Sequence, residues 1–295
     1  MVRLTKEQKT IKINNLLNLF KETNKQIFTT LDLKSLKEDA ILSKYIPSKT
    51  TFPEFLTFLI ENSILKYVCL DFTNRDVKRL FFEEPNVYEL AISINPNCYF
   101  SHYSAVFINN LTDNIPKIIY INNEQSPKHK QEEPLKQIDI TKSFYKEPRT
   151  SKNIAKYKDY KICWLNGKNT NNLGVVEKII DNNLKVKVTN IERTLIDISV
   201  SPHYAGGVVE VLNAYKSAKG RFSVEKMANM LKNINFRYPY HQVIGYYLEK
   251  AGYKEKEYQL FRDFGIEYKF FVVRNIDDKN RDFNDKWNLY VPKSL

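Results

Sequence analysis

The chain has 295 residues, which is enough for two domains of ordinary size or for one large domain. Hydrophobic residues make up 42% of the chain, including 19 Tyr and 18 Phe, and this excludes an intrinsically disordered protein. No apolar run approaches the roughly 20 residues that cross a bilayer, and the charged N-terminus lacks the apolar region of a secretory signal. Three well-separated cysteines favour reduced thiols over disulfides or a zinc site, so we expect a cytoplasmic protein without a membrane partner.

The formal net charge of +12 indicates an acidic partner such as nucleic acid, but the charge is unevenly distributed. Residues 1–95 carry 14 basic and 12 acidic side chains, whereas residues 116–187 carry 15 basic and 8 acidic ones. The excess therefore lies in the middle of the chain. Two interpretations stay open there: a solvated lysine-rich surface, or a surface that binds an acidic partner.

The first third of the chain predicts three helices followed by a β-hairpin. Apolar residues recur at helical spacing in residues 5–23, 31–42 and 51–61, and the last of these starts with a capping box of Thr51 and Glu54. Two β-rich runs follow, Ile64–Phe72 and Val77–Glu83, and a polar junction of four residues between them indicates a hairpin. This order is that of a winged helix-turn-helix.

In a winged helix-turn-helix, the N-terminal end of the third helix enters the major groove and the hairpin touches the DNA backbone. At these two places the sequence supplies the candidate DNA-binding residues Ser48, Lys49, Thr50, Thr51, Arg75, Lys78 and Arg79. The alternative is a small α+β module that docks a protein, because the third helix has few Arg, Asn or Gln residues on its outer face.

The rest of the chain predicts a mixed α/β domain, so we expect an α+β protein with domains 1–95 and 96–295. The predicted helices are 100–111, the segments starting at Thr189 and at Gly206-Gly207, 223–232, and 239–251, which Gly252 ends. The predicted strands are 117–121, 160–165, 186–188, 268–273 and 288–291. Residues 123–153 are predicted as an irregular surface segment with one short strand at 135–140.

Two segments of this second domain resemble signature segments of the AbiEi-type antitoxins. One is Phe100–Ile121, with small residues at Ser101–Ala105 and then Asn110-Leu111-Thr112 leading through Ile115-Pro116 into a strand. The other is Thr189–Tyr215, with Glu192–Asp197 and the Gly206-Gly207 pair. Arg193 and Asp197 are four residues apart on one helix, so we expect them to pair. The resemblance follows the order of elements over most of the chain.

The resemblance implies an antitoxin of a bacterial toxin–antitoxin system that acts in phage defence by abortive infection. Such proteins neutralise a co-encoded nucleotidyltransferase-like toxin, and repress transcription of their own operon by binding inverted repeats in promoter DNA. It also implies a protein that is not an enzyme. The competing interpretations are an adaptor that docks proteins in a defence complex without binding DNA, and a metal-dependent nuclease.

The motifs of common enzymes do not occur in the sequence. None of the four histidines lies in a metal-binding pair, and no glycine-rich phosphate loop is present, so we expect no catalytic residue, metal or cofactor. The best catalytic candidate is the acidic run from Asp263 to Lys269. There Glu267 and Lys269, on a strand, resemble the paired groups of metal-dependent nucleases, although a surface salt bridge along the strand is the better interpretation of them.

Overall fold

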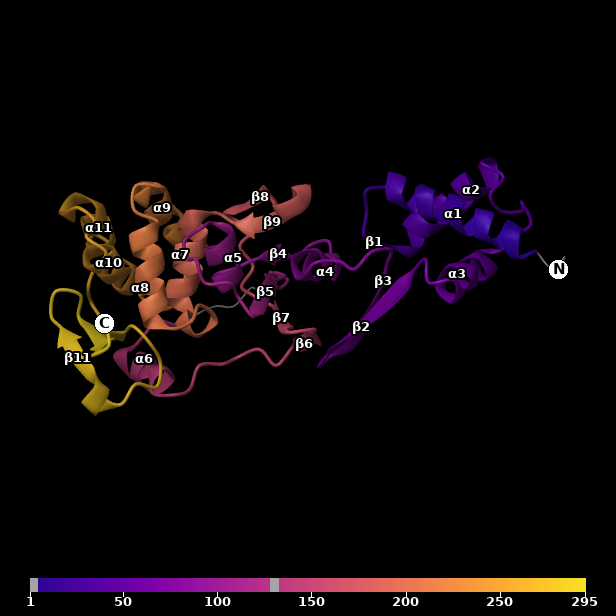
Figure 1. Cartoon of the computed structure of the whole chain (residues 1–295). Helices are drawn as coiled ribbons and strands as arrows, with labels where there is room; N and C mark the ends of the chain where they lie inside the picture. The colour runs from indigo at the N-terminus through magenta and orange to yellow at the C-terminus, as the bar shows by residue number, and fades with distance from the viewer. Residues whose placement is uncertain (1–4, 128–132) are drawn as a thin grey trace. The chain divides into compact units, whose positions relative to one another are not determined.

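The computed structural model of the chain describes residues 5–127 and 133–295, which divide into two compact units. Unit 1 comprises Met1–Pro96 with Ala155–Tyr157, and unit 2 comprises Asn97–Ile154 and Lys158–Leu295. Both units contain helices and strands, so the chain is an α+β protein (Figure 1).

The three helices predicted for unit 1 are confirmed, as α1 (Lys6–Glu22), α2 (Thr30–Leu42) and α3 (Phe52–Glu61). Each helix starts after a threonine whose hydroxyl accepts a hydrogen bond from the backbone three residues later, namely Thr5, Thr29 or Thr51. The side chain at that third position reaches back to the backbone N–H of the threonine, which completes a capping box. Local sequence therefore fixes where all three helices begin.

The predicted hairpin is also confirmed, as β2 (Lys66–Phe72) and β3 (Arg75–Phe81). Its turn contains two residues and not four, because Phe72 pairs with Arg75 directly before and after it. A short strand, β1 (Ile27–Phe28), pairs antiparallel with β3 and gives the order β1-β3-β2. The helix α4 (Val87–Ser93) follows. Neither β1 nor α4 was predicted, because each is too short to show a periodic pattern of apolar residues.

The core of unit 1 lies between the helices and this sheet. The ring of Phe20 on α1 stacks on Phe82 with centroids 5.3 Å apart, and meets Phe28 of β1 edge to face at 5.0 Å. Leu16 of α1 and Leu59 of α3 are fully buried in the same cluster. The helices are thereby held on one face of the three-stranded sheet.

Unit 2 contains a mixed sheet whose strands follow the order β7-β5-β4-β9-β8. Antiparallel pairs join β4 to β5 and β8 to β9, whereas β4 with β9 and β5 with β7 are parallel. The strands are β4 (Tyr99–Phe100), β5 (Ile118–Asn122), β7 (Tyr160–Leu165), β8 (Val175–Ile180) and β9 (Leu184–Thr189). The strand β6 (Ile154–Tyr157), which precedes β7 in the chain, groups largely with unit 1.

The helices of unit 2 pack around one large core, and α7 to α11 lie side by side in Figure 1. The helices are α5 (His102–Ile108), α6 (Gln137–Phe144), α7 (Ile191–Val200), α8 (Val208–Ser217), α9 (Val224–Ile234), α10 (Tyr240–Lys250) and α11 (Glu255–Arg262). A small sheet of order β10-β12-β11 closes the unit, with β10 (Phe270–Phe271), β11 (Arg281–Asn284) and β12 (Leu289–Pro292).

Three local predictions for unit 2 are wrong. The segment 135–140 is not a strand but part of α6, because Ile140 and Phe144 are both buried at a spacing of four residues. The helix expected to start at Thr189 starts at Ile191 with Asn190 as its cap, since Thr189 ends β9 and its hydroxyl lies 2.7 Å from the hydroxyl of Thr194. The strand predicted at 268–273 shrinks to the two residues of β10.

Two expectations concern the chain as a whole. The helices in the described part of the chain are all too short or too polar to cross a membrane. The three cysteines form no disulfide; Cys69 is exposed, whereas Cys98 and Cys163 are buried.

Candidate nucleic-acid interface

The turn between α2 and α3 presents the first four candidate DNA-binding residues. Ser48 and Lys49 are exposed and Thr50 is half-buried. Thr51 is occupied as the cap of α3: its backbone N–H and its hydroxyl both donate to Oε2 of Glu54, at 2.8 and 2.9 Å. These bonds lower the pKa of the Glu54 carboxyl, which is ionised at neutral pH. A negative charge thus lies one turn inside α3.

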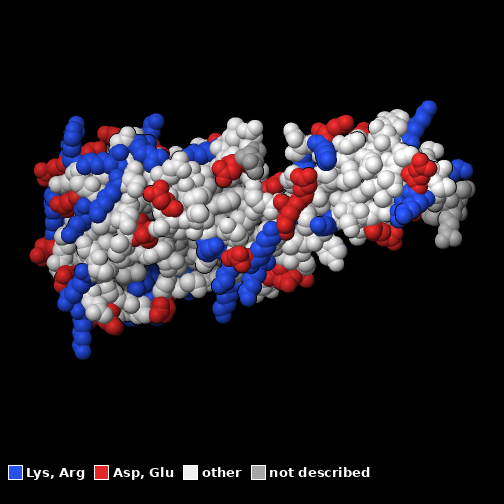
Figure 2. Space-filling model, in the orientation of Figure 1, with Lys and Arg blue, Asp and Glu red and all other residues white. Residues whose placement is uncertain are grey.

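The outer face of α3 is acidic and apolar. Its exposed positions include Glu54, Ile60 and Glu61, and the helix contains no Lys or Arg. Basic side chains that could meet phosphates therefore lie beside α3 and not on it. Figure 2 shows basic (blue) and acidic (red) side chains scattered among uncharged ones over the visible face of unit 1.

A cavity of about 710 Å³ lies beside this helix, between α1, the α2–α3 turn and α3. Its walls combine three lysines, Lys12, Lys44 and Lys49, with apolar side chains such as Ile11, which is 55% exposed. The ammonium of Lys12 lies 4.1 Å from the centroid of the Phe58 ring, and partial burial lowers its pKa. This surface is suited to an amphipathic partner as well as to phosphate.

The hairpin presents the remaining candidates. Arg75 is exposed next to the turn, and Lys78 is exposed on β3 with its ammonium 4.0 Å from the ring centroid of Tyr67. The strand register places Asp71 directly opposite Asp76, beside Cys69 and Lys78. The hydrogen bond that the Cys69 thiol donates to the Asp71 carboxylate is the main cause of the raised pKa of that thiol. One face of the hairpin is therefore acidic next to Lys78.

Arg79 differs from the other candidates because its guanidinium caps the end of α4. Its Nε and Nη2 donate to the carbonyl of Ser93 at 2.9 and 2.7 Å, and Nη2 also donates to Ile94 at 2.8 Å. Nη1 donates to the carbonyl of Lys78 at 2.8 Å. Burial, together with the nearby charge of Arg75, lowers the pKa of Arg79. Its hydrogen bonds thus hold α4 against β3.

The two segments that carry the family resemblance meet in the interior of unit 2. Asn109, at the end of α5, donates to the carbonyl of Thr189 at 2.9 Å and to the hydroxyl of Thr194 at 3.1 Å. Lys178 donates to the Asn109 side chain at 2.6 Å. Arg221 donates through Nη2 to the Asn109 carbonyl at 2.7 Å. Asn109, Thr189 and Thr194 are buried and bonded to one another, so they explain how the two segments pack.

Arg193 and Asp197 pair as expected, but in the interior and not on the surface of the helix. Their side chains are 6% and 10% exposed, and Arg193 Nε lies 2.8 Å from Asp197 Oδ1. Nη1 of Arg193 donates further to the hydroxyl of Thr170 and the carbonyl of Leu173, at 2.9 and 2.7 Å. The pair joins α7 to the loop before β8, which is a structural task.

The residues of the nuclease hypothesis do not lie on the expected strand. Residues 263–269 leave α11 as a turn and a loop, and Lys269 lies with its ammonium 5.5 Å from the ring centroid of Phe283. Over the described residues, the one close grouping of three metal-type ligands is Cys69, Asp71 and Asp76 on the hairpin. That grouping is fully exposed and does not include Glu267.

The sequence did not identify the role of Arg79 or the cations that gather around one cavity of unit 2. Lys142, Lys146 and Arg149 belong to the segment predicted as irregular, and the structure brings them near Arg274. Their local sequence holds no motif. The sole available signal was the excess of basic residues between 116 and 187.

No family model matches the chain, and no curated protein matches it. Among solved structures it is similar to the crystal structure of the RV2827C protein from Mycobacterium tuberculosis, with a TM-score of 0.62 and 10% sequence identity. The match covers 98% of this chain and 92% of that one. At this level of identity, the similarity establishes a common fold and nothing about activity.

Proposed function

We propose that unit 1 is a winged helix-turn-helix that binds duplex DNA. The observation that carries this proposal is the element order α1-β1-α2-α3-β2-β3, with the three strands in one antiparallel sheet. In this motif α3 enters the major groove by its N-terminal end, and the β2–β3 hairpin lies along the backbone. The exposed residues at those two places include Ser48 and Lys49 in the turn and Arg75 and Lys78 on the hairpin, beside the acidic Glu54, Asp71 and Asp76.

The contacts to phosphate are few under this proposal. Ser48, Lys49 and Thr50 meet the DNA from the α2–α3 turn, and Arg75 and Lys78 from the hairpin. Thr51 and Arg79 act indirectly, since the first fixes the start of α3 and the second fixes α4 on β3. Three cations per chain give a salt dependence of about −2.7 in log affinity against log salt, at about −0.9 for each phosphate.

We further propose that the chain is an antitoxin that represses its own operon and neutralises a co-encoded nucleotidyltransferase-like toxin. This part rests on the resemblance of Phe100–Ile121 and Thr189–Tyr215 to the AbiEi-type antitoxins. Both segments lie in unit 2, so neutralisation is assigned to unit 2 and promoter binding to unit 1. In this proposal the chain performs no catalysis.

The test is a gel shift with the promoter region, run beside a reporter assay and a growth-rescue assay with the toxin. Lys49→Glu combined with Lys78→Glu should abolish the shift and repression but retain rescue, because it places like charges against the phosphates. The matched control is Lys9→Glu with Lys21→Glu, which makes the same charge change on the exposed surface of α1. Equal loss of binding in both variants would contradict the proposed interface.

A second candidate function is a protein-docking adaptor, and the cavity between α1 and α3 favours it. That cavity joins exposed Ile11 to Phe55 and Phe58, which would suit the apolar face of a partner helix. Under that function the chain co-purifies with its partner without retaining DNA, and Ile11→Asp abolishes the co-purification. Under the DNA-binding proposal, the same substitution leaves rescue unchanged.

A further inference from the structure

A cavity of about 630 Å³ with a strongly charged lining lies in unit 2. Its walls are the end of α6 with the loop that follows, the Ser201–His203 turn, and Val272–Arg274 after β10. The rings of Tyr238 and Tyr240 complete the lining. Sites for small ligands have volumes of about 300–1,000 Å³, so one ligand of that class fits here.

The lining of this cavity has an excess of positive charge. It contains five basic side chains, Lys142, Lys146, Arg149, Arg237 and Arg274, against two acidic ones. Both acids are engaged: Asp139 lies 3.8 Å from Arg237, and Glu147 accepts a hydrogen bond from Asn275. Within residues 5–127 and 133–295, the side-chain nitrogens of Lys142, Lys146 and Arg149 have no hydrogen-bond or ion-pair partner. Three exposed basic side chains therefore line this one cavity.

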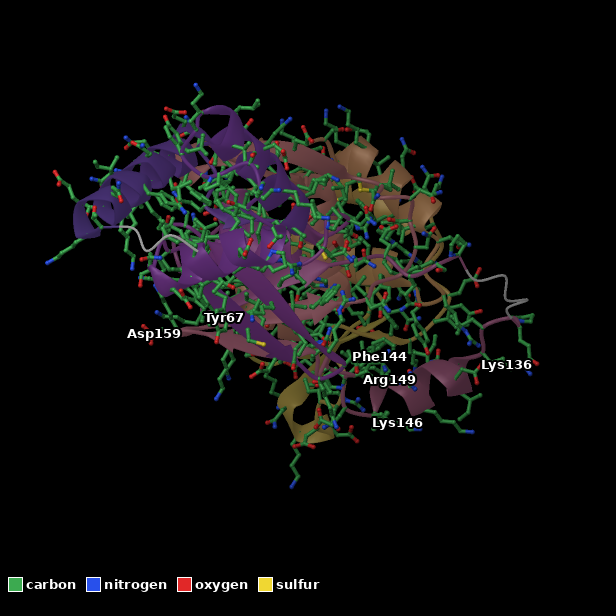
Figure 3. The ribbon with its side chains drawn as sticks, turned by 90° about the vertical axis from the view of Figure 1, so that its right-hand side faces the viewer. Tyr67, Lys136, Phe144, Lys146, Arg149 and Asp159 are labelled. Carbon is green, nitrogen blue, oxygen red and sulfur yellow. The ribbon has the colours of Figure 1, made fainter. Side chains whose placement is uncertain are left out.

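Arg274 is the fixed member of this group. Its Nη1 donates to the carbonyl and the hydroxyl of Ser143, at 2.5 and 2.8 Å. Its guanidinium carbon lies 4.2 Å from the ring centroid of Phe144 and 5.8 Å from that of Tyr238. A guanidinium held in this way loses little conformational freedom when an anion binds. Figure 3 shows Phe144, Lys146 and Arg149 close together along the end of α6 and the loop after it.

His203 adds an unsatisfied polar atom to the same wall. Its Nε2 is buried and has no hydrogen-bond partner among the described residues, which is costly unless a ligand or water supplies one. His203 and Arg274 also line an adjoining cavity of about 450 Å³, so the two hollows share one wall. A ligand oxygen at this wall would meet both side chains.

We infer that this cavity binds a nucleoside phosphate. Its phosphates lie among Lys142, Lys146, Arg149 and Arg274, and its base lies against the half-buried ring of Tyr238. Lys and Arg side chains around one cavity can donate charge-assisted hydrogen bonds to phosphate oxygens. An aromatic ring in the cavity wall stabilises a base by stacking. The volume suits one nucleotide, either free or at the 5′-phosphorylated end of a strand.

The test is calorimetric titration of the full chain with a purine nucleoside triphosphate, the nucleoside alone, pyrophosphate, a 5′-phosphorylated oligonucleotide and a glutamate-rich peptide. The triphosphate should bind and the nucleoside should not. Lys146→Glu with Arg149→Glu should weaken the triphosphate at least about tenfold, through the loss of two charge-assisted contacts. Tyr238→Leu should weaken the triphosphate but not pyrophosphate.

The control is Lys216→Glu, which changes one exposed lysine on α8 outside the cavity and should leave the affinity unchanged. Because Lys146 and Arg149 are exposed, their variants should keep the wild-type circular dichroism; the alanine pair serves if the glutamates disturb it. The inference is overturned if no nucleotide binds, if the peptide binds as tightly as the triphosphate, or if Lys216→Glu weakens binding equally. Tighter binding of the oligonucleotide than of the triphosphate identifies a strand end as the source of the phosphate.

Discussion

The two units use their polar residues in different ways. In unit 2, the motif residues that carry the family resemblance, such as Asn109, Arg193 and Asp197, are buried and bonded to one another. In unit 1, the residues assigned to DNA are exposed around the acidic α3, and Thr51 and Arg79 are engaged within the unit. The motif residues of unit 2 therefore serve packing, whereas the residues that we assign to DNA in unit 1 are accessible to a partner and form no sequence motif.

The largest expected effect is the loss of the buried ion pair in unit 2. Asp197→Ala leaves Arg193 charged and unpaired in the interior, so we expect it to lower the free energy of unfolding by about 3–5 kcal/mol. The matched control is Glu177→Ala, which breaks the exposed pair with Lys185 at 2.7 Å and should cost less than about 1 kcal/mol. Urea denaturation measures both. Equal destabilisation would show that burial does not distinguish the two pairs.

The next effect is an acid sensitivity at the start of α5. Burial lowers the pKa of His102 to about 4, although the nearby Asp197 carboxylate by itself raises that pKa. An unfolded histidine titrates near its ordinary pKa of about 6.5. Between pH 6.5 and 4 the unfolded chain therefore binds a proton that the folded chain excludes, and stability falls as the pH falls.

Each pKa unit corresponds to about 1.4 kcal/mol, so the loss from His102 over this interval should reach about 3 kcal/mol. Urea midpoints measured from pH 7 to pH 4.5 should fall less steeply for His102→Gln than for the wild type. The variant can be less stable at pH 7 without affecting this test, which depends on the slope. Identical slopes would contradict the assignment to His102.

The smallest effect separates two neighbours on β3 in unit 1. Arg79→Ala should lower the free energy of unfolding by about 1.5–3 kcal/mol, because charged hydrogen bonds to Ser93 and Ile94 are lost. Lys78→Ala loses its contact with the Tyr67 ring, at about 1 kcal/mol or less. In a gel shift, Lys78→Ala should weaken DNA binding more than Arg79→Ala does, provided that the Arg79 variant is measured while folded. If Lys78→Ala proves more destabilising than Arg79→Ala, our account of the hairpin is wrong.

Much of the fold could be predicted because its signals are local. The capping box at Thr51 and the spacing of Leu16 and Phe20 depend on residues within one or two turns. The segment 135–140 shows where such reasoning fails. Its apolar residues are too few to distinguish periods, and the burial of Phe144 against Phe270 and Phe271 selects a helix.

The α+β class, the helices and hairpin of unit 1, and the pairing of Arg193 with Asp197 could all be predicted from the sequence. The roles of Arg79 and Arg274 could not, because they depend on packing between distant segments. Arg79 holds α4 because the carbonyl of Ser93, 14 residues away, lies beside it. Arg274 meets Ser143 across 131 residues of chain to form the basic cavity. A charge acts through the acceptors nearest to it in space, and for charges such as these that proximity is created by packing between distant segments.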